Sequence, residues 1–160
     1  MRKVIVNSTP LIALCKIQAL DILRQLYGEV TIPESVLMEI LFKRDSACQQ
    51  IQANANWVHI DRIRDENARA AFEPNLHVGE VDVIILARGE RDALVILDDY
   101  RARQKARALG LRLTGTLGVL VRAKSAGLIP QVAPLAIALK ENGIYIADNI
   151  LAQTLKNSGE

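Results

Sequence analysis

Acidic side chains occur in this sequence where a buried strand should end or a helix should begin. The apolar stretch 94–97 runs directly into Asp98 and Asp99, and Glu80 and Asp82 open a second apolar stretch. Polar groups at the carboxyl ends of parallel strands converge on a common ligand site. Carboxylates gathered in one cleft repel one another unless a proton or a cation relieves them, and an all-oxygen ligand set suits Mg²⁺ or Mn²⁺. The sequence therefore predicts a divalent-metal site at this edge of a sheet.

Two further residues belong to the candidate metal set. Asn7 follows the apolar triplet 4–6 and offers an amide oxygen without a charge, with the polar side chain of Ser8 beside it. Glu39 lies within the apolar stretch 36–41, and an acid that faces a core must be paired, protonated or bound to a cation. Both have simpler explanations, because Asn often caps a helix and glutamate often faces solvent on one.

The paired acids also have structural explanations. Asp98 and Asp99 are typical turn residues, and Asp99 is a suitable N-cap for the helix that follows. Glu80 and Asp82 lie in the first turns of a helix, where the helix dipole favours acids. Spacing alone does not decide between Glu80 and Asp82, or between Asp98 and Asp99, as the ligand.

Short apolar strands alternate with helices along the chain, which predicts an α/β fold with a central, mostly parallel sheet covered on both faces. Residues 57–60 form a less certain strand, and the charged stretch 61–73 is a solvated helix or a loop. We find no repeat or linker, so we expect residues 1–160 to form a single domain. The expected strands are 4–6, 30–32, 94–97 and 111–113, and the helices begin near residues 11, 21, 33, 80, 100, 117, 132 and 148.

Composition excludes several classes of protein. The net charge of +2 is too small for strong binding to nucleic acid through overall charge. Cys15 and Cys48 form no metal-binding motif, and no apolar run approaches the ~20 residues of a membrane span. We expect a cytoplasmic protein that does not enter a membrane.

A basic helix begins next to Asp98 and Asp99 and carries Arg101, Arg103 and Lys105. Cations that flank a metal cluster suit a phosphodiester substrate, because phosphate contacts position a nucleic-acid backbone. For any single one of these residues, a solvated helix face is the simpler interpretation. With Ser8 they form the predicted nucleic-acid-binding set.

In combination these motifs resemble the PIN-like domain family, in particular small prokaryotic proteins related to the PIN nucleases of toxin–antitoxin pairs. The resemblance covers nearly the whole chain. It depends on residues 4–12, on 32–34 followed by Glu39, and on 79–84, 97–103 and 113–120. The last two blocks together are fairly specific to this branch.

The resemblance implies a three-layer α/β/α PIN-like fold whose acidic cluster holds Mg²⁺ or Mn²⁺ and hydrolyses single-stranded RNA. By position, the metal residues are Asn7, Glu39, Glu80, Asp82, Asp98 and Asp99, of which Glu39, Asp82 and Asp98 are the predicted catalytic residues. It also implies an antitoxin protein as partner and a homodimer.

Asn7 departs from the usual Asp of the family. The alternative is therefore a catalytically degenerate module that binds nucleic acid or protein. A domain of the response-regulator kind is a remote third reading, since no convincing pair of strand-end Asp and later Lys is present.

Overall fold

A computed structural model describes residues 2–54 and 56–160 of the chain. Within these residues, five strands form one parallel sheet in the order β3-β2-β1-β4-β5. All residues of the central strands β1 and β4 are buried, as expected for parallel strands that are covered on both faces. The strands are β1 (Val4–Val6), β2 (Val30–Pro33), β3 (Val58–Asp61), β4 (Leu94–Ile96) and β5 (Arg112–Thr114).

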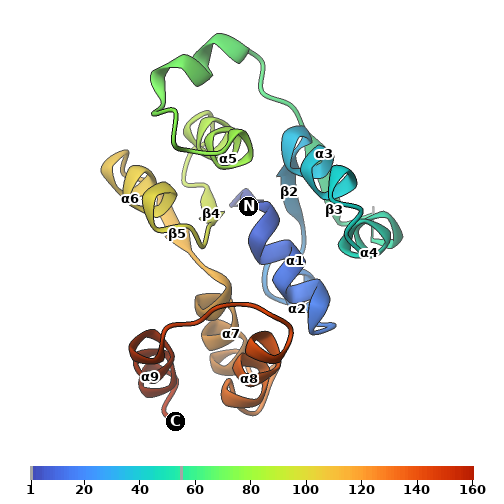
Figure 1. Cartoon of the computed structure of the whole chain (residues 1–160), viewed down its shortest axis with the longest axis vertical. Coiled ribbons are helices and arrows are strands. Elements are labelled where there is room, and N and C mark those ends of the chain that lie inside the picture. The colour runs from blue at the N-terminus through green and yellow to red at the C-terminus, as the bar shows by residue number, and fades with distance from the viewer. Residues whose placement is uncertain (1, 55) are drawn as a thin grey trace.

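Helices connect the strands and cover both faces of the sheet (Figure 1). α5 and α6 pack on one face, and α1, α2 and α7 lie on the other, which confirms the predicted three-layer α/β/α fold. The helices are α1 (Ser8–Lys16), α2 (Asp21–Tyr27), α3 (Glu34–Phe42), α4 (Ala47–Ala53), the 3₁₀ helix η1 (Glu66–Ala71), α5 (Val78–Arg88), α6 (Tyr100–Ala108), α7 (Thr116–Ser125), α8 (Ala133–Glu141) and α9 (Asp148–Asn157).

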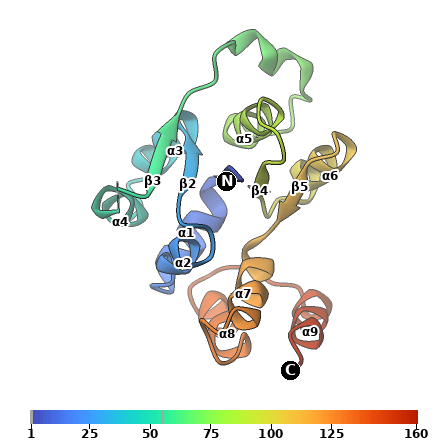
Figure 2. The same ribbon diagram turned by 180° about the vertical axis from the view of Figure 1, so that it is seen from behind.

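The C-terminal helices α7, α8 and α9 gather at one end of the molecule (Figure 2). The carboxylate of Glu160 joins them, because it accepts hydrogen bonds from the backbone N–H groups of Val132 and Ala133 at 2.7 and 3.0 Å. These two N–H groups lie at the start of α8, where no intrahelical acceptor is available. The side chain of Glu160 therefore caps α8.

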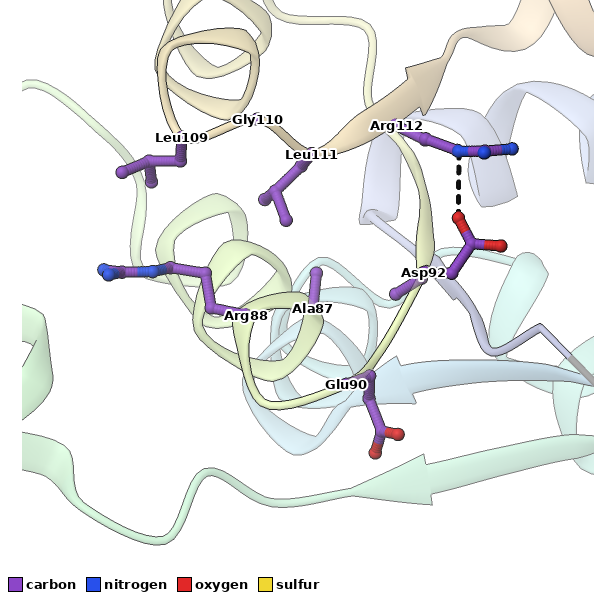
Figure 3. A pocket seen from close by; sticks show the side chains of 9 residues that line it. Ala87, Arg88, Glu90, Asp92, Leu109, Gly110, Leu111 and Arg112 are labelled. Atoms are coloured by element: carbon purple, nitrogen blue, oxygen red, sulfur yellow. Dashed lines mark ion pairs between the residues drawn. The ribbon is translucent and has the colours of Figure 1, made fainter.

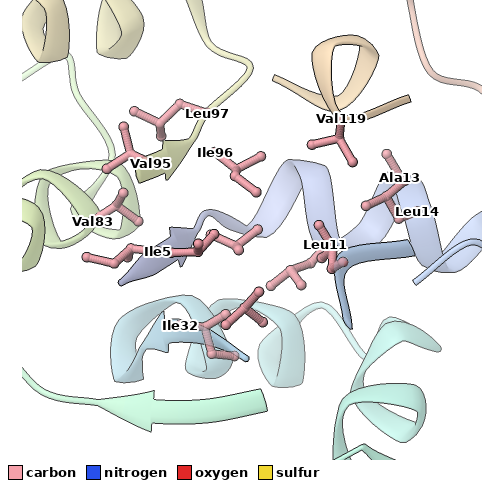
Figure 4. Packing of buried hydrophobic residues seen from close by; sticks show 14 of the residues in the cluster. Ile5, Leu11, Ala13, Leu14, Ile32, Val83, Val95, Ile96, Leu97 and Val119 are labelled. Carbon is pink, nitrogen blue, oxygen red and sulfur yellow. The ribbon is translucent and has the colours of Figure 1, made fainter. Parts of the chain in front are cut away.

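The core lies between the two central strands and the helices on either side (Figure 4). Ile5 and Ile96 from the strands, Leu11 from α1 and Val83 from α5 are all fully buried. Cys15 belongs to the same core, whereas the side chain of Cys48 lies outside the described part of the chain. Within the described residues, no helix is both long and apolar enough to cross a membrane.

The segment that had no clear assignment in the sequence, from about residue 48 to 75, contains α4, β3 and η1. No bounds were predicted for α4, because three of its seven residues are glutamine and its apolar pattern is short; among the residues whose side chains are described, only Ala47 and Ile51 are buried. The strand expected at 57–60 is confirmed as β3, an edge strand with exposed residues at its centre. The solvated helix or loop expected at 61–73 contains the short helix η1, none of whose residues is buried.

Ile5 and Ile60 offer a direct test of the core. Ile5→Ala should lower the free energy of unfolding by about 2–5 kcal/mol, because it leaves a cavity at a fully buried site. Ile60→Ala deletes the same atoms from a residue of edge strand β3 that is 44% exposed, so it should cost much less. Urea denaturation measures both values, and equal losses would contradict the placement of β1 at the centre of the sheet.

Candidate functional site

The candidate site lies where the order of the strands in the sheet reverses. β1 and β4 are neighbours, and the chain leaves them towards opposite edges, so a crevice forms at their carboxyl ends. The N–H of Asn7 donates to the carbonyl oxygen of Ile96 at 3.1 Å, which extends the pairing one residue beyond β1. Asn7 is only 4% exposed, and Asp98 and Asp99 follow the end of β4 directly. The predicted convergence at this edge is therefore present in the fold.

Gly79, in the first turn of α5, allows three elements to meet. A Cβ added there would lie 3.2 Å from Val36 Cγ2, 3.4 Å from Asn7 Oδ1 and 3.6 Å from Glu39 Oε2. The contact with Val36 would be tight and the other two would be ordinary van der Waals contacts. The amide oxygen of Asn7 and the carboxylate of Glu39 therefore both lie next to Gly79 at the start of α5.

Glu39 is a partly buried carboxylate with positive neighbours. Lys43, one turn later on α3, lies 3.1 Å from its Oε1. Burial opposes ionisation of Glu39, but hydrogen bonds from Ser8 and Lys43 and the nearby positive charge outweigh it, so its pKa lies below the usual value. Glu39 is therefore ionised at neutral pH. Ser8, predicted to contact nucleic acid, is buried against it.

Glu80 is the least compensated acid of the site. It is 4% exposed, and its Oε1 accepts a hydrogen bond from the backbone N–H of His77 at 3.2 Å. Its Oε2 is buried without a hydrogen-bond partner among the described residues. Burial and the negative charge of Asp99 raise the pKa of Glu80. A buried carboxylate oxygen without a hydrogen-bond partner is suited to binding a cation.

Asp99 faces Glu80 from the other side of the crevice. It is the N-cap of α6, where its Oδ2 accepts a hydrogen bond from the N–H of Ala102 at 3.0 Å. The side chain is otherwise exposed. Asp99 therefore performs the capping role that its position suggested and also contributes a negative charge next to Glu80.

Asp82 points away from that pair. It is 2% exposed, and its two oxygens accept hydrogen bonds from Arg69 at 2.9 and 2.8 Å and from the hydroxyl of Ser35 at 2.6 Å. Glu80 and Asp82, two residues apart on one helix, thus face α6 and α3 respectively. The carboxylate of Asp82 is already neutralised by an arginine.

Asp98 is likewise engaged within the protein. Its carboxylate accepts hydrogen bonds from the N–H and the hydroxyl of Thr116 at 2.7 and 2.6 Å, and so anchors the N-terminus of α7. A Cβ on Gly115 would lie 2.7 Å from Asp98 Oδ1, so this turn requires glycine. In the described structure, Asp98 ties β4 to α7.

The predicted basic residues on α6 differ in how far other groups of the protein already engage their side chains. Arg103 Nη1 donates to the carbonyl oxygen of Leu97 at 2.8 Å, and burial and the neighbouring Arg107 lower its pKa. Lys105 Nζ lies 5.7 Å from the centroid of the Phe72 ring, within cation–π range. Arg101 is exposed to solvent. Of the three, Arg101 is thus the one most open to a phosphate.

The acids of the edge do not form a ready-made cage. In the described part of the chain, no three His, Cys, Asp or Glu side chains are arranged to hold a metal ion together. A hollow of the surface lies at the opposite ends of β4 and β5, where Arg112 and Asp92 form an ion pair (Figure 3).

Two residues near the site were missed from the sequence. His77 was left without a role, yet it is the N-cap residue of α5 and its backbone N–H donates to Glu80 Oε1 at 3.2 Å. Arg69 was part of a stretch interpreted as solvated, yet it holds Asp82. No sequence signal identifies Arg69, because it lies in η1, thirteen positions before its partner Asp82.

Comparison with known proteins agrees with this architecture. A family model described as a PIN domain matches residues 3–160. The chain belongs to the PIN-domain family. Among solved structures, a PilT N-terminus domain protein from the hyperthermophilic archaeon Sulfolobus solfataricus P2 is similar, with a TM-score of 0.53 and 13% identity. That match covers 75% of this chain and 92% of the archaeal chain and supports the fold alone. No curated protein matches the sequence.

PIN domains are generally nuclease folds and typically depend on divalent metal ions. The residues of this PIN domain suit such an ion in their chemistry, because every candidate ligand is an oxygen. The orphaned Oε2 of Glu80 is the observation that fits best. Asn7 at the first acidic position removes one negative charge. Glu39 is paired with Lys43 and Asp99 caps α6, so Glu80 is the acid that keeps a buried oxygen without a partner among the described residues.

The raised pKa of Glu80 predicts a pH-dependent stability in the absence of metal. Its proton is favoured in the folded state, so the stabilising contribution is present at low pH and is lost as pH rises through the folded pKa. In EDTA at pH 7, Glu80→Gln should therefore raise the melting temperature. The difference from wild type should vanish below the ordinary glutamate value of 4.5. Thermal melts across this pH range measure it, and a Gln variant that melts lower at pH 7 would contradict the uncompensated burial of Glu80.

Proposed function

We propose that this PIN domain is a metal-dependent ribonuclease that hydrolyses phosphodiester bonds of single-stranded RNA. The single observation that carries the proposal is the buried, unpartnered Oε2 of Glu80, which faces Asp99 at the edge where the strand order reverses. Two acids that are held together against their mutual repulsion are suited to a divalent cation. The PIN fold supplies the general nuclease character.

Within the predicted set, we assign Glu80, Asp99 and Glu39 as metal ligands, with the amide oxygen of Asn7 beside them. Asp82 and Asp98 are then positioning residues, because their oxygens are engaged by Arg69 and Ser35 and by Thr116. This assignment replaces Asp82 and Asp98 as the catalytic residues of choice. It is supported by hydrogen-bond occupancy, since both oxygens of Asp82 and both of Asp98 accept at least one donor, whereas Glu80 Oε2 accepts none among the described residues.

A bound divalent ion would polarise the scissile phosphate and lower the pKa of a water molecule for in-line attack. The contribution of the protein is to orient the ligands. α5 carries Glu80, Asp99 caps α6, and Ser8 and Lys43 keep Glu39 ionised. The exposed Arg101 lies one turn into α6 and offers a phosphate contact next to Asp99.

The biological setting completes the proposal. We propose a cytoplasmic toxin of a toxin–antitoxin pair, with a small antitoxin protein as partner and a homodimer as the working form. The exposed side chains of Ile137 on α8 and Ile150 on α9, 52% and 51% exposed, support a surface for self-association.

Cleavage of a labelled single-stranded RNA tests the activity. Wild-type protein should cleave in Mn²⁺ and not in EDTA. Glu80→Gln and Asp99→Asn should each slow cleavage by about 100-fold or more, the scale that follows loss of one group stabilising transition-state charge. Asp148→Asn, which removes a fully exposed carboxylate from α9, is the matched control and should cleave as wild type does. Equal activity of all four proteins would refute the assignment.

Asn7→Asp restores the acid that the family usually has. Because the amide oxygen and the carboxylate of Glu39 both lie next to Gly79, a carboxylate at position 7 should raise the Mn²⁺ affinity by roughly tenfold, the effect of about 1.4 kcal/mol of added interaction. Isothermal titration calorimetry measures the change. Asn75→Asp, an exposed substitution of the same kind shortly before α5, should leave the affinity unchanged. No gain from Asn7→Asp would place Asn7 outside the ligand set.

A second candidate function is a degenerate PIN module that binds nucleic acid or protein without turnover. It is favoured by the lack of three preassembled acid ligands in the described residues and by the arginine that occupies Asp82. Wild-type protein that binds RNA in EDTA but never cleaves it in Mn²⁺ would support this alternative over the nuclease.

A further inference from the structure

The segment between β3 and α5, residues 62–77, passes over α5 on the outside of the molecule (Figure 1). Two contacts hold it against neighbouring helices. Arg69 pairs with Asp82 of α5, and the ring of Phe72 lies under Lys105 of α6. The 62–77 segment is thus attached on both sides of the N-terminal half of α5, which also carries Glu80.

The guanidinium of Arg69 is fixed in orientation by this attachment. Its Nε and Nη2 donate to the two oxygens of Asp82, and Ser35 adds a third donor to the same carboxylate. The Asp82 side chain is 3% exposed, so its place is set by the packing of α3 against α5. A bidentate guanidinium–carboxylate pair is planar and specific in geometry. A carboxylate buried to this degree therefore determines where the guanidinium points.

One edge of that guanidinium remains open. Nη1 donates no hydrogen bond to any described residue, and the Arg69 side chain is 33% exposed. A guanidinium has five N–H donors, and the pairing with Asp82 uses two nitrogens on one side. The remaining donors can bind a second acceptor, and the fork of an arginine matches the oxygens of a phosphate.

The position of Arg69 relates it to the acidic edge. Asp82 and Glu80 are two residues apart on α5, and Ser35 and Glu39 are neighbours at i and i+4 on α3. Such neighbours lie about 5–6 Å apart between their Cβ atoms. Arg69 is therefore linked through the carboxylate of Asp82 to Ser35, which lies one turn before Glu39 on α3.

We propose that Arg69 is a substrate-binding residue that contacts a backbone phosphate of the single-stranded RNA, with Asp82 and Ser35 as its positioning residues. This inference rests on the proposed ribonuclease function and names a binding group that the sequence did not reveal. Nucleases with two metal ions place positive charge on both sides of the phosphate. Here the guanidinium of Arg69, held in place by Asp82, supplies one of those charges. This role explains why Asp82 is paired with an arginine of the protein.

The test measures binding of a fluorescein-labelled single-stranded RNA by fluorescence anisotropy at several KCl concentrations. EDTA is present throughout, so that no cleavage occurs. The decisive variant is the double change Arg69→Gln with Asp82→Asn, because it removes both charges, keeps the net charge and retains side chains that can hydrogen-bond. We expect its affinity to fall by roughly tenfold, and the slope of log K against log salt to decrease by about 0.7, the value for one phosphate contact on a single strand.

Arg62→Gln is the matched control. Arg62 lies in the same segment and also pairs with a glutamate, Glu34, but both side chains are largely exposed. Its loss should change neither the affinity nor the salt slope appreciably. Equal binding by wild type and the double variant overturns the role of Arg69 while leaving the nuclease intact, since Mn²⁺-dependent cleavage reports that separately. Failure of wild-type protein to bind RNA overturns both.

A measurement on wild-type protein covers the case in which the double variant does not fold. Phenylglyoxal modifies arginine side chains, and mass spectrometry reports each site. Bound RNA in EDTA should reduce modification of Arg69 several-fold and leave that of Arg62 unchanged. Equal modification of Arg69 with and without RNA would overturn the proposal.

Discussion

The parallel pairing of β1 with β4 is the constraint on which the rest of the structure depends. Val4, Ile5 and Val6 align with Leu94, Val95 and Ile96, and the pairing continues through the N–H of Asn7. Both strands are buried completely, so a shift in register would place polar residues in the core. This register fixes Asn7 beside the end of β4 and hence sets the starting positions of α1 and α6. The positions of the acids at this edge therefore depend on the pairing of two apolar triplets, Val4–Val6 and Leu94–Ile96.

The acids of that edge are stabilised in different ways, and these differences divide them by role. The carboxylate of Asp82 is paired with an arginine, and that of Asp98 accepts hydrogen bonds at the start of a helix. Glu39 is kept ionised by its neighbours. Glu80 has no such partner on one oxygen, and burial favours its protonated form. A protein that needed only a stable edge would have little reason to leave that oxygen unpaired.

Much of this architecture could be predicted from the sequence, because apolar triplets and helix boundaries are local signals. The central strands, most helices and the convergence of Asn7, Glu80 and Asp99 follow from periodicity and from the rule that parallel strands end at one edge. The bounds of α4 could not, since three of its seven residues are glutamine and its apolar pattern is too short to define a helix. The choice between Glu80 and Asp82 also could not, because both suit the first turns of a helix. What separates them is which neighbouring helix each one faces, and that depends on how α3 and α6 pack against α5.

The charges and protons at this edge of the sheet compete with any ion that binds there. A ligand carboxylate must be deprotonated before it coordinates, so ion binding at Glu80 competes with the proton that burial favours. At Glu39 the competitor is Lys43, whose ammonium must move aside. Asn7 adds no charge to draw the ion in. Affinity for a divalent ion should therefore be lower than in a site with an acid at every position, and should rise with pH as Glu80 loses its proton.

If Arg69 binds a backbone phosphate as proposed, it would partly offset this weakness, because the guanidinium fixed by Asp82 would attract a phosphate that brings further oxygen ligands to the ion. Metal and RNA would then bind with positive coupling, each supplying charge that the other requires.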